Sequence, residues 1–192
     1  MTSGLVPYTE LEAVNEILAV GSNSPVSTLN ENQVIDASLA RNTLKAVLVE
    51  ILSRGWAFNT EYGVELHPDQ DGHIRLPRNT LKVKAVDGSA VVQRGSLLYD
   101  RTNRTNKFTS AVTVDLVIGM TFEDLPSTVR VCATITAARR YQDRFFGDEA
   151  VHSYTLQDEV QAKAAMWDEE IEMQGANMLT DSNTMRNLTS RK

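Results

Sequence analysis

The chain has 192 residues and a formal net charge of −6 at pH 7, enough sequence for one domain or for a helical unit with a smaller β unit attached. The acidic balance excludes tight duplex DNA or RNA binding as the main activity, because such proteins carry a large basic surface. A single cysteine, Cys132, excludes an intrachain disulfide framework and hence a small oxidised secreted protein. We find no signal-peptide pattern at the amino terminus and no apolar run near the roughly 18 residues of a membrane span, so we expect a soluble protein made in a cytoplasm.

The first part of the chain predicts two helices. Thr9 and Glu12 have capping-box spacing and open a helix that reaches about Val20, where Gly21 is expected to adopt the left-handed conformation that ends it. The second helix is predicted from about Gln33 to Arg54, because apolar residues recur at intervals of three and four. These residues are Ala37, Ala40, Leu44, Val47, Leu48, Ile51 and Leu52.

Between Trp56 and Met120 the pattern changes to the alternation of β-strands. Residues 81–86 alternate apolar and polar side chains with a period of two. Asp87-Gly88 predicts a hairpin to the next strand, and Arg94-Gly95 predicts a weaker turn. Five or six short antiparallel strands in sequence order favour a small sandwich or open barrel.

Two further helices are predicted after the strands. Pro126 suits the first turn of a third helix that reaches about Phe146, with an apolar line of Val131, Ile135, Ala138 and Phe145. Thr155 is predicted to open a fourth helix that ends at Gly175. Its predicted core line is Leu156, Val160, Ala164, Trp167 and Ile171. We therefore expect Trp167 to be buried among the helices and Trp56 at their junction with the β unit.

The predicted architecture is α+β. Residues 1–55 and 121–175 are expected to form a four-helix bundle, and residues 56–120 an antiparallel β sandwich or barrel inserted between helices two and three. Residues 176–192 are polar and without a periodic apolar face, which is typical of an extended tail.

The side chains most able to carry chemistry form no known catalytic pattern. His67, Asp69, Asp71 and His73 are metal-ligand types, but a short Asp-x-Asp-Gly run without a downstream Glu is more typical of a turn. The carboxylates Asp168, Glu169, Glu170 and Glu172 crowd one helix, unlike the facing pair of a glycosidase. We find no nucleophile elbow, P-loop or dinucleotide fingerprint. The sequence predicts no catalytic residues, no metal and no cofactor, and hence no enzyme.

Charged residues suggest contacts instead. Basic residues of the third helix and acidic residues of the fourth can pair within one chain or between neighbouring copies of an assembly. They are Arg139, Arg140, Arg144, Glu169 and Glu170. The polar loop that holds Arg101, Arg104 and Lys107 either binds an acidic partner or is simply solvated.

Several segments, in order and spacing, resemble the tail tubular protein A family, the head-to-tail adaptors of short-tailed phages. They are Ser24-Pro25-Val26-Ser27-Thr28-Leu29, Ser53-Arg54-Gly55-Trp56-Ala57-Phe58-Asn59, Leu98-Tyr99-Asp100-Arg101, Arg144-Phe145-Phe146-Gly147 and Asn177-Met178-Leu179. The resemblance extends from about Leu11 to Leu179. The chain departs from the family pattern between His67 and Leu81 and in the last dozen residues.

The resemblance implies a structural virion protein, located in the tail and in the host cytoplasm during assembly. Family members form a twelve-fold ring beneath the portal protein, pass DNA through its bore without sequence-specific binding, and bind the tubular nozzle protein and tail fibres. An acidic ring repels DNA and lets it slide. We expect portal contacts from tail residues Met178, Leu179, Met185, Arg186, Leu188, Arg191 and Lys192. We expect nozzle or fibre contacts from Arg101, Arg104, Lys107, Asp69 and Asp71.

Two alternatives from other classes remain open on the sequence. One is a virion-associated glycan hydrolase that uses surface carboxylates, and the other is a free-standing binding module. Neither implies a membrane partner.

Overall fold

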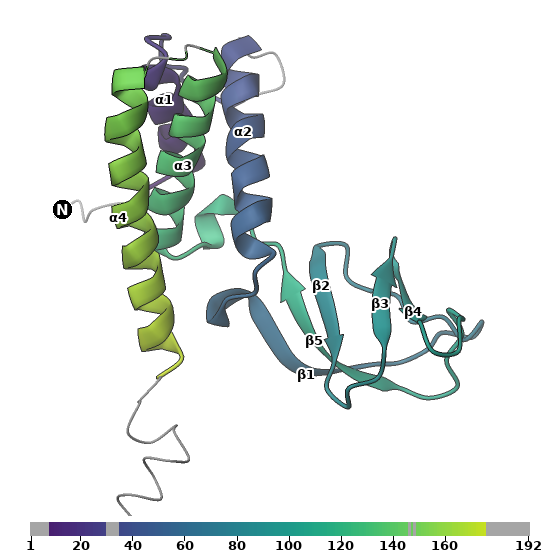
Figure 1. Cartoon of the computed structure of the whole chain (residues 1–192). Coiled ribbons are helices and arrows are strands. Elements are labelled where there is room, and N and C mark those ends of the chain that lie inside the picture. Colours follow the sequence, from purple (N-terminus) through teal and green to yellow (C-terminus); the bar gives the residue numbers. More distant parts are fainter. Residues whose placement is uncertain (1–7, 30–34, 146, 148, 176–192) are drawn as a thin grey trace, which may run out of the picture.

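The structure, a computed structural model, describes residues 8–29, 35–145, 147 and 149–175, and within them five strands lie between two pairs of helices (Figure 1). The helices are α1 (Glu10–Val20), α2 (Ile35–Leu52), α3 (Ser127–Phe145) and α4 (Glu149–Met173). The strands are β1 (Thr60–Leu66), β2 (Thr80–Ala85), β3 (Val91–Arg94), β4 (Leu97–Asp100) and β5 (Val112–Ile118), with short 3-10 helices η1 (Ala57–Asn59) and η2 (Phe122–Asp124). The predicted α+β class is confirmed. No helix in the described ranges combines the length and apolar character that crossing a membrane requires.

The helical part is organised around α3. α1, α2 and α4 each pack along it, and Figure 1 shows α4 and α2 on opposite sides of α3, with α1 behind. α3 can serve as the centre because small residues repeat along it and let its neighbours approach closely. Its buried small residues are Cys132, Ala133, Ala137 and Ala138.

The first two helices follow the sequence closely. Thr9 and Glu12 form the predicted capping box of α1. Gly21 does not take the expected left-handed conformation: its φ is −88°, and Ser22 adopts positive φ instead. α2 ends at Leu52, before the predicted end at Arg54, and its predicted start at Gln33 lies outside the described residues. Most of its predicted apolar residues are buried. These are Ala37, Ala40, Leu44, Val47, Ile51 and Leu52.

The last two helices bury other faces than those predicted. α3 leaves Val131 and Phe145 exposed, and α4 begins at Glu149, before the predicted start at Thr155. The predicted core line of α4 is wrong, because all of its members are exposed: Leu156, Val160, Ala164, Trp167 and Ile171. The buried described positions of α4 are Glu159, Ala162, Met166 and Glu170. Its two buried carboxylates find donors on α3 and η1, which fixes this face inward.

The β part consists of a three-stranded antiparallel sheet in the order β1-β5-β2 and a separate two-stranded sheet of β3 and β4. The hairpin predicted at Asp87-Gly88 is wrong, because β2 pairs with β5 and not with β3. The turn at Arg94-Gly95 makes the β3–β4 hairpin. A second apolar core fills this part, and its fully buried residues are Ile74, Leu98 and Val114.

A buried joint connects the two parts. The Asn59 side chain donates to the Leu52 carbonyl of α2 at 3.0 Å and to the Ile118 carbonyl of β5 at 2.9 Å. Its Oδ1 accepts from the Trp56 amide at 2.8 Å. Because the end of α2 and the end of β5 share one buried amide side chain, the β part is held at a defined angle to the helices (Figure 1).

Candidate interaction surfaces

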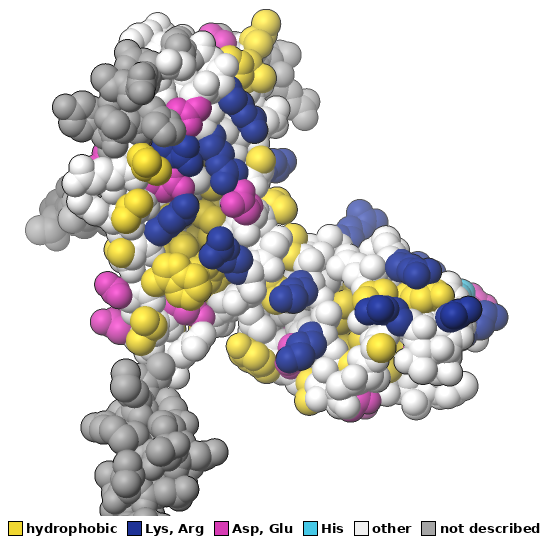
Figure 2. Space-filling model, viewed as in Figure 1, with side chains coloured by type: hydrophobic (Ala, Val, Ile, Leu, Met, Phe, Trp, Pro, Cys, Tyr) yellow, Lys and Arg dark blue, Asp and Glu magenta, His cyan; other side chains and the backbone are white. Residues whose placement is uncertain are grey.

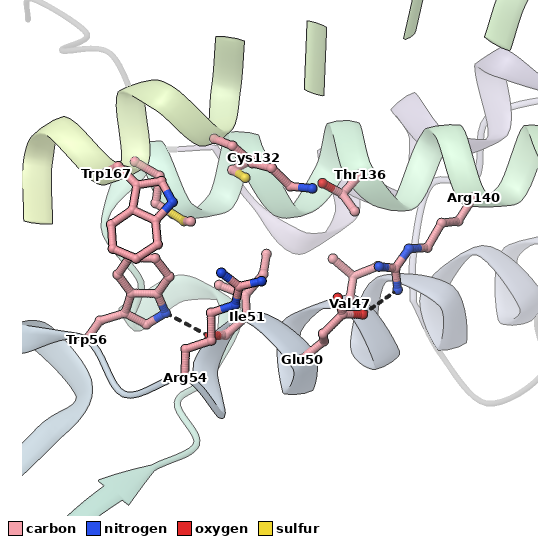
Figure 3. A pocket seen from close by; sticks show the side chains of 11 residues that line it. Val47, Glu50, Ile51, Arg54, Trp56, Cys132, Thr136, Arg140 and Trp167 are labelled. Carbon is pink, nitrogen blue, oxygen red and sulfur yellow. Dashed lines mark hydrogen bonds and ion pairs between the residues drawn. The ribbon is translucent and has the colours of Figure 1, made fainter. Parts of the chain in front are cut away.

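A pocket of about 70 Å³ opens between α2, α3 and α4 (Figure 3). We call it the Trp groove, because Trp56 and Trp167 form one end of it. The other lining residues are Val47, Glu50, Ile51, Arg54, Cys132, Thr136, Arg140, Lys163 and Met166. The groove forms because α2 and α4 both pack on α3 without packing along one another.

The two tryptophans are in contact but differ in burial. Their ring centroids are 4.7 Å apart with the planes tilted by 59°. Trp56 is 2% exposed, and its Nε1 donates to the Ile51 carbonyl at 2.7 Å. Trp167 is 46% exposed. The expectation for Trp56 is confirmed. The expected burial of Trp167 is wrong, because among the described residues its ring packs against Trp56 and stays nearly half exposed.

The rim of the Trp groove is basic. Arg54, Arg140 and Lys163 line it together with one carboxylate, Glu50. Arg140 Nη1 lies 2.7 Å from Glu50 Oε2, and this hydrogen bond holds the pKa of Glu50 below its usual value. Figure 2 shows hydrophobic side chains gathered on this face of the helical part with Lys and Arg around them. Such a face suits an apolar partner with acidic edges.

Of the other basic and acidic residues that we predicted between helices three and four, Arg139, Glu169 and Glu170 have partners within the chain. The buried Glu159 accepts hydrogen bonds from Arg139 and Lys163. Burial raises the pKa of Glu159, but the two cationic donors outweigh it and the net shift is downward. Glu170 accepts from the Ala57 amide at 2.9 and 3.0 Å, and Glu169 accepts from the Thr128 hydroxyl. Arg144 is exposed.

A second apolar surface lies across the α3–α4 seam from the Trp groove. We call it the Val131 surface; Val131 is exposed at its centre, Thr128 and Ile135 of α3 are half-buried beside it, and Ile135 also packs against the helical core. The Glu169 carboxylate of α4 contacts Thr128, and α1 packs elsewhere on α3. Val131 is 43% exposed. Val131 and Ile135 directly precede Cys132 and Thr136 of the Trp groove, so their side chains leave α3 about 100° further round its axis.

The helix α1, which also packs on α3, is acidic. α1 carries Glu10, Glu12 and Glu16 and no Lys or Arg. Glu10 pairs with Arg41 of α2 at 2.8 Å, and Glu12 bonds to Thr9 in the capping box. Glu16 accepts a hydrogen bond from the hydroxyl of Tyr8, whose backbone carbonyl is held by Arg130 of α3 at 2.8 Å. Neither the Val131 surface nor the positions of Arg54 and Lys163 at the Trp groove were predictable from the sequence pattern. Apolar residues occur all round α3, so no periodicity separates its exposed positions from its buried ones.

The predicted nozzle or fibre residues come together at the end of the β part. The 68–73 turn and the 101–108 loop are joined by the Phe108 amide, which donates to the Gly72 carbonyl at 2.8 Å, and by a β-bridge between His73 and Lys107. Asp100 Oδ1 accepts from the Thr102 and Asn103 amides, which shapes the loop. The side chains placed on this β tip are Asp69, Asp71, Arg101, Arg104 and Lys107, all exposed.

Asp69, Asp71 and His73 place their ligand-type atoms within 4.8 Å of one another. The Asp69 carboxylate is already engaged, since Oδ1 accepts from the His73 amide at 2.8 Å and the Asp71 amide at 3.1 Å. These bonds, chiefly the one from His73, lower the pKa of Asp69. The arrangement is that of a turn stabilised by an Asp side chain, and we infer no metal site from it.

The remaining predicted residues give no further site. The portal-binding residues in 176–192 lie outside the described residues. The carboxylates of α4 diverge, since Glu170 is buried while Asp168 and Glu172 are exposed elsewhere around the helix. Cys132 is buried, and burial raises the pKa of its thiol, which leaves it protonated and unreactive.

Comparison with known proteins agrees with the resemblance seen in the sequence. The profile of the family described as "Tail tubular protein" matches residues 11–176. The chain is 33% identical over 152 residues to tail tubular protein A of Klebsiella phage KP34, an alignment that covers 78% of this chain and 81% of that protein.

Proposed function

This chain belongs to the tail tubular protein family, and from that premise we propose that it is the adaptor ring that joins the portal to the tubular nozzle of a short-tailed phage. The coarser conclusion, a structural component of the phage tail, follows from the family itself. The observation that carries the proposal is the match along residues 11–176, which takes in both the helical and the β parts. In this proposal twelve copies surround a channel through which DNA passes.

The form of the molecule supports this role. Its helical part offers apolar surfaces on different sides, as a ring subunit requires for contacts with two neighbours. Its β tip projects away from the helices and exposes charged loops on a rigid scaffold (Figure 1). We assign the bundle of residues 1–55 and 121–175 to the ring, the β unit of residues 56–120 to the nozzle and fibres, and residues 176–192 to the portal.

The proposal is tested with purified full-length protein and purified portal rings. The expected result is co-sedimentation of the protein with portal, and electron micrographs that show an added twelve-fold ring on one end of the portal. We expect the protein alone to remain largely monomeric. Absence of binding to portal, together with normal tails on phage that lack the gene, would contradict the adaptor role.

A further inference from the structure

We propose that the Trp groove face of one copy packs against the Val131 surface of the next copy, so that one contact, repeated head to tail, closes the ring. This inference rests on the proposed function, which it deepens by assigning the two surfaces and their register. The occupant of both surfaces is thus a second copy of this chain. Both surfaces include side chains of α3 and α4.

An apolar line of side chains is exposed along α4. The line Leu156, Val160, Ala164, Trp167 and Ile171 runs along α4 at intervals of three and four, beside the Trp groove. Val160 is 60% exposed and Ile171 is 52% exposed. A line of this kind spans about 22 Å of helix, at about 1.5 Å per residue. A continuous apolar face on a helix marks a contact with another element. In the described part of the chain Trp56 contacts Trp167, and the members of the line all stay exposed.

The Trp groove and the Val131 surface differ from each other and lie on opposite sides of the α3–α4 seam. The α3–α4 seam, marked by the Arg139–Glu159 and Thr128–Glu169 contacts, separates the Trp groove from the Val131 surface. A contact between two different surfaces of identical copies is heterologous, and such contacts generate rings or filaments in place of closed dimers. A face that paired with itself would instead give a two-fold dimer.

The charged side chains also favour a contact between the two different surfaces. The Trp groove is lined by three cations and one carboxylate. Arg140 pairs with Glu50 and Lys163 with the buried Glu159, whereas Arg54 acts on Glu50 through its charge alone. At the Val131 surface the Glu169 carboxylate of α4 contacts Thr128, and Glu16 of α1 bonds to Tyr8, whose carbonyl is held by Arg130 of α3. Bringing the basic rim to these carboxylates is favourable, whereas two copies that met through the same surface would place like charges together.

The register follows from the positions of the residues along the helices. The Thr128–Glu169 and Arg139–Glu159 contacts fix the register of the antiparallel helices α3 and α4, and this register places Trp167 level with Val131. In this proposal the ring axis runs along the helices, and a rotation about such an axis leaves every level unchanged. Trp167 of one copy therefore meets Val131 of the next, and Ala164, one turn along α4, lies close to the same point.

The test uses thiols placed on both surfaces. Full-length protein with Val131→Cys and Ala164→Cys is supplied to phage that lack the gene, and the resulting particles are treated with a short bis-maleimide. We expect a ladder of covalent dimers, trimers and larger multimers on a denaturing gel. Each single variant should give no ladder, because a heterologous contact never brings two copies of one position together.

A second pair of cysteine positions, matched for exposure, controls for crosslinks that form by random collision. Val49 lies on the outer side of α2 and is 51% exposed, comparable to Val131. Particles with Val49→Cys and Ala164→Cys should therefore give no ladder. Likewise Val131→Asp should keep the melting temperature of the monomer within a few degrees yet reduce incorporation into tails at least tenfold, whereas Val49→Asp should be incorporated normally.

The outcomes separate the inference from the proposed function. Normal tails without a ladder from the Val131 and Ala164 pair would overturn the inference and leave the adaptor role intact. Crosslinks from these positions to the portal or another virion protein, or dimers from either single variant, would overturn it as well. Absence of the unmodified protein from tails would instead overturn the adaptor role.

Discussion

Glu159 is the carboxylate on which the attachment of α4 to α3 depends most directly. It is buried between Arg139 of α3 and Lys163 of its own helix. Removing its charge leaves Arg139 partly buried without its main partner, and lost hydrogen bonds to charged groups cost about 1–3 kcal/mol. We expect Glu159→Gln to lower the free energy of unfolding by about this amount at pH 7, as measured by urea denaturation. Glu172→Gln, on the exposed side of α4, should leave it nearly unchanged.

Glu159 also makes the stability of the folded protein depend on pH. Because its pKa in the folded protein lies below the ordinary value of 4.5, Glu159 contributes stability that is fully present above about pH 5 and is lost as the pH falls through the folded pKa. The wild type and Glu159→Gln should therefore converge in stability on acidification. A stability difference that stays constant from pH 7 to pH 3 would contradict this account.

Two glycines with positive φ allow the cost of backbone strain to be measured separately from the cost of a steric clash. Gly55 has φ +81°, and a Cβ there would lie 2.8 Å from Val117 Cγ2; Gly63 has φ +66° and open space around it. Val117 cannot yield easily, because it is nearly buried in β5 and β-branched. Gly63→Ala should cost about 1–2 kcal/mol from left-handed strain alone. Gly55→Ala should cost more, and equal losses in thermal denaturation would show that the joint adapts.

Among the secondary-structure elements, α4 shows most clearly what the sequence can and cannot predict. Its apolar periodicity was real, but periodicity identifies an apolar face and not what covers that face. The buried side of α4 instead contains Glu159 and Glu170, whose donors come from residues distant in sequence. Pairing of this kind is invisible to a local pattern.

The β part shows the same limit in another form. The strands were predictable from their alternation, whereas their pairing was not. Asp87-Gly88 has the composition of a hairpin turn, yet β2 pairs with β5, which lies far along the chain. Non-local pairing overrode the local turn preference. The charged β tip, by contrast, was predictable, because exposed polar loops need no distant partner to be recognised.

Trp56 and Trp167 should respond very differently to truncation. Trp56→Ala removes a buried ring and its hydrogen bond to α2, and such losses cost about 3–5 kcal/mol. Trp167→Ala removes a ring that is half exposed, so we expect a loss of about 1–2 kcal/mol, chiefly its contact with Trp56. Thermal denaturation with tryptophan fluorescence distinguishes them, because Trp56 alone should emit at the shorter wavelength. Equal destabilisation would mean that Trp167 is covered in the free protein.

At the scale of the whole molecule, the β tip should be separable from the ring. Replacing Arg101, Arg104 and Lys107 by Ser leaves the backbone contacts between the two tip loops in place. The fold and portal binding should persist, while attachment of nozzle or fibres weakens and tails remain incomplete in micrographs. The matched control replaces Lys82 and Lys84 of β2 by Ser. Complete tails on the tip variant would reassign the nozzle and fibre contacts to other parts of the β unit.

The carboxy-terminal segment should be needed for docking but not for folding. Its sequence combines Met185 and Leu188 with the cations Arg186, Arg191 and Lys192, side chains suited to pockets and acidic groups on another protein. The described residues of the two cores all lie at or before Met166. Deletion after Asp181 should leave the melting temperature unchanged and reduce co-sedimentation with portal rings at least tenfold. If the truncated protein binds portal as well as the full chain does, the helical part must hold the joint, and the crosslinked ladder from Val131 and Ala164 should then form on portal without the segment.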